Sequence, residues 1–180
     1  MTVLFRSLHG CFSLSAVLLW TALVSAPAHA QLGSGGAPSA DALIEALLET
    51  LPDRQRTRAR QSDPFGVTGV YERTSDEGPP RVDVRIMYGQ MGLRQAESFV
   101  QRPATDSTTT ADGRTLYSGV VEMGSPQGIV LWTTDPFVVA VEAHGSRDDE
   151  LTAADAEVAL PTLRRLLVDH ISPDDLPALA

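Results

Sequence analysis

One segment of the chain, residues 137–143 with the sequence FVVAVEA, limits the possible folds more than any other. Its side chains are apolar on both alternating sets of positions, with Glu142 as the exception. A β-strand places successive side chains on opposite faces of a sheet, so a strand with two apolar faces must be covered on both sides. The segment therefore predicts a central strand rather than an edge strand.

The remaining periodicity predicts four more strands and three helices. Strands are expected at 67–74, 82–88, 115–123 and 129–134, and the turn sequence SDEGPP at 75–80 predicts a hairpin between the first two. Apolar residues spaced by three and four predict helices over 41–51, 91–101 and 152–171, with a capping box formed by Thr152 and Asp155. Residues 53–64 and 103–113 are polar and are expected to connect these elements.

These elements predict a single α+β domain over residues 41–172. Its order is α-β-β-α-β-β-β-α, and its simplest packing is a mostly antiparallel five-stranded sheet covered by two or three helices. Residues 31–40 (QLGSGGAPSA) are expected to form a flexible leader, and residues 173–180 a loose C-terminal tail.

The first thirty residues have the pattern of a secretory signal peptide. Arg6 precedes an apolar run from 11 to 26, and Ala28-His29-Ala30 supplies the small residues that signal peptidase accepts. The run is shorter than the roughly 20 residues that a membrane-spanning helix needs. We therefore expect export to the periplasm or the extracellular space, with no transmembrane segment after cleavage.

Composition excludes several classes of function. All 14 basic residues are arginine, there is no lysine, and 23 acidic residues give a formal net charge of −9. The chain therefore has no Schiff-base lysine and no phosphate-binding Gly-Lys loop, and its charge does not suit nucleic-acid binding. The single cysteine, Cys11, leaves with the signal peptide, so we expect no disulfide and no thiolate metal site. No cofactor and no metal are predicted.

Candidate catalytic residues are few. His144 and His170 are the histidines that follow the predicted cleavage site, and no G-x-S-x-G nucleophile elbow is present. A hydrolase-like enzyme that uses His144 with Ser146 or nearby carboxylates is the alternative reading of the chain. The acidic residues around 148–157 match no calcium-binding loop and are expected to favour the start of the last helix.

Two sets of residues are candidates for binding. Arginines recur at every second position at Arg54, Arg56, Arg58 and Arg60, which places all four on one side if the segment is extended. Such a ridge suits an envelope protein with an acidic surface or an anionic lipid, whereas its structural alternative is an edge strand protected by charge. Tyr117 and Trp132 are expected to line a ligand pocket or to belong to the core.

The pattern from Gly128 to Gly145, an apolar strand, a tight turn and a second apolar strand before a helix, resembles small exported bacterial proteins of uncharacterised function. The layout is also similar, in fold only, to the PsbP type of sheet-plus-helix domain. The resemblance implies no catalytic residues. Together with the lack of a reactive motif, it favours a non-enzymatic exported envelope protein that binds a partner or a small ligand.

Overall fold

The computed structural model describes residues 37–63, 66–122, 124–146 and 148–177. The predicted signal peptide, most of the predicted leader and the last three residues of the predicted tail lie outside these ranges. Within them, no helix combines the length and the apolar character needed to cross a membrane.

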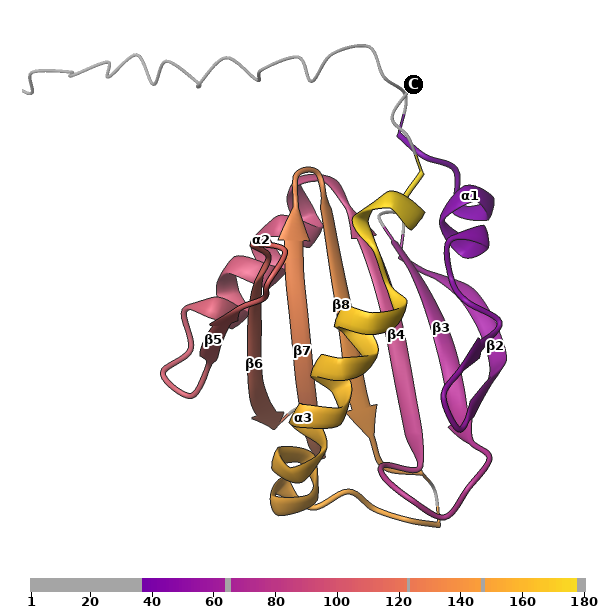
Figure 1. Ribbon diagram of the computed structural model, residues 1–180, viewed down its shortest axis with the longest axis vertical. Helices are drawn as coiled ribbons and strands as arrows, with labels where there is room; N and C mark the ends of the chain where they lie inside the picture. The colour runs from indigo at the N-terminus through magenta and orange to yellow at the C-terminus, as the bar shows by residue number, and fades with distance from the viewer. Residues whose placement is uncertain (1–36, 64–65, 123, 147, 178–180) are drawn as a thin grey trace, which may run out of the picture. The chain divides into compact units, whose positions relative to one another are not determined.

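The described residues form one antiparallel sheet with the strand order β1-β2-β3-β4-β8-β7-β6-β5 (Figure 1). The strands are β1 (Thr50–Leu51), β2 (Arg54–Asp63), β3 (Gly66–Arg73), β4 (Arg81–Tyr88), β5 (Asp106–Thr109), β6 (Thr115–Glu122), β7 (Pro126–Thr134) and β8 (Phe137–His144). Every neighbouring pair is consecutive in the chain except β4 and β8, which join two four-stranded meanders. The prediction that residues 137–143 form a central strand is confirmed, since β8 lies between β4 and β7.

The prediction of a five-stranded sheet is wrong, because the sheet has eight strands. All five expected strands are present as β3, β4, β6, β7 and β8, and the sequence pattern missed β1, β2 and β5. β5 is exposed at every position, and β2 is polar along most of its length. β5 pairs with β6 alone, and β2 pairs with β3 and with the two-residue strand β1. Backbone pairing holds both strands, so they carry little of the apolar alternation that reveals a half-buried strand.

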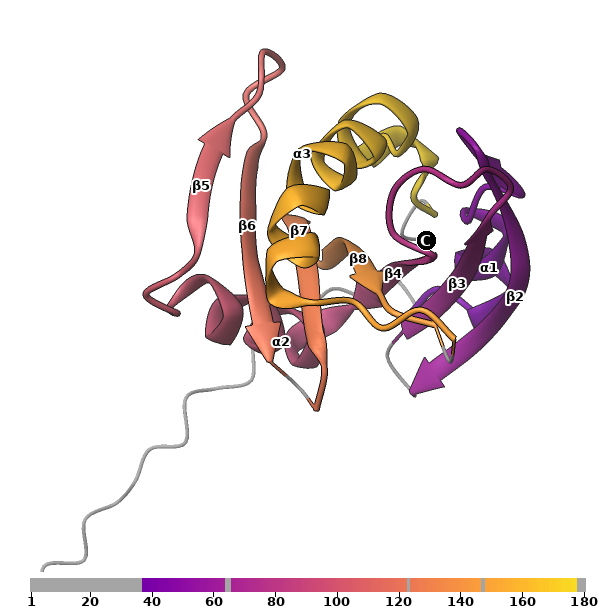
Figure 2. The same ribbon diagram turned by 90° about the horizontal axis from the view of Figure 1, so that it is seen from below.

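Helices cover both faces of the sheet. The helices are α1 (Ala40–Glu45), α2 (Gly89–Val100) and α3 (Ala153–His170), followed by the short 3-10 helix η1 (Pro173–Asp175) within the expected loose tail. Figure 2 shows α2 and α3 on opposite sides of the sheet, and α1 packs on the same side as α3. The Thr152–Asp155 capping box is confirmed at the start of α3. α1 is shorter than expected, although Leu47 and Leu51 beyond its end are still buried.

The larger part of the core lies between the sheet and α3. Trp132, Leu163 and Leu167 are almost completely buried there. A Cβ atom at Gly128 would lie 2.6 Å from the carbonyl oxygen of Ala156, so a glycine is needed for α3 to approach β7 this closely. A second, smaller cluster of apolar side chains lies between α2 and strands β4, β6, β7 and β8.

Tyr71 on β3 ties the segment after α1 to the sheet. Its ring is fully buried, and its hydroxyl donates a hydrogen bond of 2.6 Å to the carbonyl oxygen of Leu48. Burial raises the pKa of Tyr71 to about 12, against the opposing effects of the charge and hydrogen bond of Arg56. The folded protein therefore holds the phenolic proton more tightly than the unfolded chain does.

We expect the stability of the protein to fall as pH rises from about 10 to about 12. An unfolded tyrosine loses its proton near pH 10, whereas folded Tyr71 keeps its proton until about pH 12. Between these two pH values, ionisation stabilises the unfolded state and not the folded state, so the free energy of unfolding falls. Tyr71→Phe should cost about 1 kcal/mol at neutral pH through the lost hydrogen bond and should flatten this alkaline decline. Urea unfolding at several pH values measures both effects. Tyr117→Phe is the control and should keep the decline, whereas an equal decline in Tyr71→Phe would assign it to another group.

Candidate functional site

A groove of about 420 Å³ runs along one side of α2, on the face of the sheet opposite α3. Its walls and floor are largely apolar. Phe99 and Ala96 contribute from the helix, and the floor from four strands consists mainly of Met87, Val121, Ile129, Leu131 and Ala140. A volume of this size lies within the about 300–1,000 Å³ typical of small-molecule sites. We call this feature the α2 groove.

Arginines border the α2 groove. Arg94 lies on α2 and Arg102 just beyond its end, both are exposed, and neither forms an ion pair with any other side chain in the described part of the chain. Arg85 reaches the groove from β4. Because the protein is acidic as a whole, this local excess of positive charge distinguishes the groove from most of the surface.

A charged cluster adjoins the groove on the same face, where β4 pairs with β8. Arg81 donates to both oxygens of Asp83, at 2.6 and 2.5 Å. Arg85 donates to Glu142 at 3.2 Å, and His144 Nε2 lies 3.3 Å from Glu142 and 3.8 Å from Asp83. Direct cross-strand pairing of Asp83 with Glu142 and of Arg81 with His144 brings these five side chains together.

The pKa of Glu142 is lowered within this cluster. Burial, the largest single influence, acts to raise it, but the hydrogen bond with His144 and the charges of Arg85 and His144 together outweigh burial. Glu142 is therefore a buried carboxylate that is held ionised by its two partners. Glu142 also lines the groove, where it neutralises Arg85, so Arg94 and Arg102 are the groove arginines without an ion-pair partner in the described part of the chain.

The expectation that four arginines share one side of an extended segment is wrong. Arg54 and Arg56 pair with Arg73 and Tyr71, but after a register shift between Arg56 and Arg58 the next two arginines pair with the other set of positions on β3. An extra residue at such a bulge reverses the alternation of the side chains. The first two arginines therefore face α1 and α3, and the last two face the side of α2.

The two pairs also differ in their surroundings. Arg54 is buried and donates to the carbonyl oxygen of Pro79 at 2.8 Å, and Arg56 donates to that of Leu47 at 2.6 Å. Both brace loops of the domain. Arg58 and Arg60 are exposed, so they are the two members of the expected ridge that remain open to an external partner.

Tyr117 and Trp132 point to opposite faces of the sheet. Tyr117 pairs with Leu131 and shares its face, so the next residue, Trp132, faces α3. Trp132 is 1% exposed and belongs to the core, with the guanidinium of Arg114 5.7 Å from the centre of its ring. Both aromatic residues border a hollow of about 430 Å³ at the end of the sheet, but they do not form two walls of a pocket between sheet and helix.

The hydrolase alternative depends on a nucleophile beside His144. Within the described ranges, the imidazole of His144 contacts carboxylates and forms no hydrogen bond with a serine hydroxyl. The backbone of Ser146 bonds to Asp149, and His170 lies at the exposed end of α3 on the other face. The histidine and the carboxylates do converge, but His144 does not line the α2 groove.

The residues that give this face its character were not predicted as site residues from the sequence. They are Arg85, Arg94, Arg102 and Glu142, and a signal for three of them was present. Arg85 and Glu142 interrupt strands that are otherwise mainly apolar, and Arg94 follows the apolar stripe of a predicted helix. A charged residue in a strand that must be buried on both faces indicates a partner on a neighbouring strand.

Comparisons with known proteins add little to this geometry. Neither the family models nor the curated proteins give a match. Among solved structures, a GTP-binding regulator from Thermotoga maritima is similar over 72% of this chain and 90% of its own, with 14% identity and a TM-score of 0.41. A likeness of this extent transfers neither the fold nor the GTP binding of that protein to this chain.

Proposed function

We propose that this protein is an exported, non-enzymatic binding protein of the cell envelope or the extracellular space, and that its α2 groove takes a single-chain amphipathic anion. The pattern of residues 1–30 supports export. One observation supports the ligand class above all: an apolar groove of about 420 Å³ is bordered by Arg94 and Arg102, which have no acidic partner in the described part of the chain.

The two parts of the groove suit the two parts of such a ligand. An alkyl chain that leaves water for the apolar floor gains about 0.8 kcal/mol for each buried methylene group. A carboxylate head group that meets a guanidinium forms a charge-assisted hydrogen bond, which also fixes the direction of the chain. A fatty acid carries both groups in one molecule, so it is the simplest member of the class.

The proposal is tested by calorimetric titration of the purified protein with dodecanoate, decanoate and dodecyltrimethylammonium. Dodecanoate should bind to one site. Removing two methylene groups in decanoate should weaken binding by roughly tenfold if both are buried. The cationic amphiphile should bind far more weakly, because it lacks a partner for the arginines and meets their repulsion.

Acetate provides the control for the head group alone and should not bind measurably at the same concentrations. Equal affinity for the cationic and anionic chains would indicate unspecific adsorption of detergents and would contradict the proposal. Affinity that does not depend on chain length would contradict the role of the apolar floor.

A further inference from the structure

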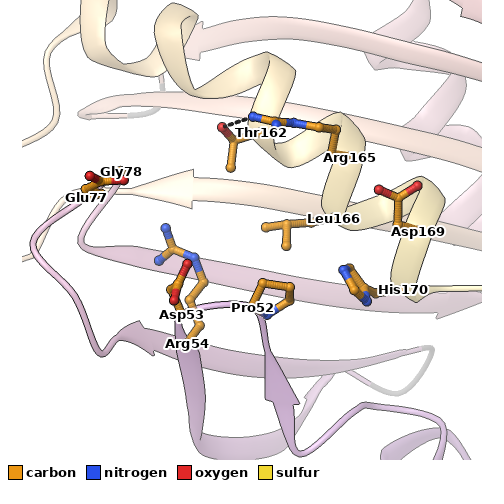
Figure 3. Close-up of a pocket in the computed structure, with 10 residues that line it drawn as sticks. All are labelled: Pro52, Asp53, Arg54, Glu77, Gly78, Thr162, Arg165, Leu166, Asp169 and His170. Atoms are coloured by element: carbon orange, nitrogen blue, oxygen red, sulfur yellow. Dashed lines mark hydrogen bonds between the residues drawn. The ribbon is translucent and has the colours of Figure 1, made fainter.

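A second cleft, of about 440 Å³, lies on the opposite face of the sheet from the α2 groove. Figure 3 shows it between α3, the turn that joins β1 to β2, and the loop before β4. The turn contributes Asp53 and Arg54, the loop contributes Glu77, and α3 contributes Arg165 and Leu166. We call this feature the α3 cleft.

Arg54 supplies a buried positive charge to the α3 cleft. The residue is 5% exposed, and Figure 3 shows its guanidinium on the side of the turn that faces α3. One nitrogen donates to Pro79, but Arg54 forms no ion pair with any residue in the described ranges. Burial and then the charge of its cross-strand neighbour Arg73 lower the pKa of Arg54, against the opposing charge of Asp53. A buried guanidinium without a bound carboxylate favours the entry of an anionic group.

Acidic side chains line the same cleft and are likewise without ion pairs among the described residues. Asp53 and Glu77 are exposed at the end of the cleft where Arg54 lies, and Asp169 lies at the far side of Leu166 (Figure 3). A simple anion in the cleft would meet these carboxylates, and a simple cation would meet Arg54. Unpaired charges of both signs around one cleft match a ligand that itself carries both.

We infer that the α3 cleft binds a small zwitterion, an α-amino acid with an apolar side chain. Its carboxylate faces Arg54, and its ammonium group faces Asp53, the acid next to Arg54 in the chain. Leu166 offers an apolar wall for the side chain, beside the charged end of the cleft. The inference does not rest on the proposed function, because the two sites lie on opposite faces of the sheet.

The experiment compares L-leucine with two molecules that each lack one of its charges. Isocaproate is leucine without the ammonium group, and isoamylamine lacks the carboxylate. Leucine should bind at least about tenfold more tightly than either in calorimetric titration at millimolar concentrations. Its addition should also shift the NMR signals of the Arg54 side chain and of Gly78, which lines the cleft and where an added Cβ would lie 3.2 Å from Arg54 Nη2.

Variants separate a specific site from a general effect of charge. Asp53→Asn should weaken leucine binding by about tenfold and should leave isocaproate binding equal or stronger, because it removes a negative charge from the cleft. Asparagine also tolerates the left-handed backbone of residue 53, whose φ is 55°. Because Asp53 is exposed, this variant should fold even if an Arg54 variant does not. Glu157→Gln, an exposed acid on α3 away from the cleft, is the matched control.

Three outcomes overturn the inference. Equal binding of leucine and isocaproate would reduce the cleft to an anion site. Equal effects of Asp53→Asn and Glu157→Gln would remove Asp53 from recognition. If the protein binds dodecanoate but not leucine, the inference about the α3 cleft is wrong, and the proposal for the α2 groove is unaffected.

Discussion

Replacing Glu142 with alanine is expected to lower the free energy of unfolding by about 3 kcal/mol or more at neutral pH. Glu142 is 7% exposed, and its carboxylate contacts both Arg85 and His144. Its removal leaves Arg85 without its counter-charge in a partly buried position, a loss that solvent only partly offsets. Urea unfolding followed by circular dichroism measures the change.

The effect of Glu142 should also depend on pH. Because the pKa of Glu142 is lowered in the folded state, its stabilising contribution is present above the ordinary glutamate pKa and is lost as pH falls through the folded value. Glu142→Ala should therefore lose less stability than the unaltered protein when both are acidified. Glu97→Ala, an exposed acid on α2, should change stability by no more than about 0.5 kcal/mol. Equal costs for the two variants would show that the charged cluster contributes nothing to stability.

Replacing both Arg94 and Arg102 with glutamine should weaken dodecanoate binding by about 10- to 100-fold. A hydrogen bond to a charged group contributes about 1.5–3 kcal/mol, which corresponds to that range of affinity. The two arginines are eight residues apart, with Arg102 beyond the end of α2, so we expect the carboxylate to contact one of them more closely than the other. One of the two single variants should therefore account for most of the loss and so reveal the direction of the bound chain.

The matched control for this experiment is Arg165→Gln, which removes an exposed arginine from α3 on the opposite face. It should leave dodecanoate affinity unchanged, and all of the variants should unfold at similar temperatures because the altered side chains are exposed. Similar losses of affinity in the control and in the double variant would mean that total charge, rather than the rim of the α2 groove, attracts the ligand.

The apolar sequence pattern was sufficient to predict the strands whose side chains form the core. It was insufficient to predict the strands that contribute few side chains to the core. β8 is apolar on both faces and β4 mainly on one, because helices cover the sheet on both sides, and both strands were predicted close to their true bounds. β2 is held by backbone hydrogen bonds to β3, and its arginine spacing gave no sign of the bulge that turns Arg58 away from the side of Arg56. Backbone pairing and bulges depend on the neighbouring strand, which local periodicity does not encode.

The candidate sites could not be predicted from the sequence for a related reason, because they depend on which strands become neighbours. Asp83 and Glu142 come together only through the register of β4 and β8, two strands far apart in the chain. To predict the α2 groove, one must know which face of the sheet α2 covers. The apolar stripe of α2 shows which side of the helix is buried but not which face of the sheet it packs on. The prediction that Tyr117 and Trp132 line one pocket was wrong because of the register of β6 and β7. Tyr117 pairs with Leu131, so Trp132, the next residue, points to the opposite face.

The single non-consecutive junction of the sheet has a consequence for the folding chain. When the first meander has formed before β8 pairs, the backbone N–H and C=O groups on the outer edge of β4 have no strand beside them. An uncovered edge of this kind is a template on which other unfolded chains can add and aggregate. The interval ends only when β8 pairs with β4, so the rate of that pairing governs how long each molecule is at risk.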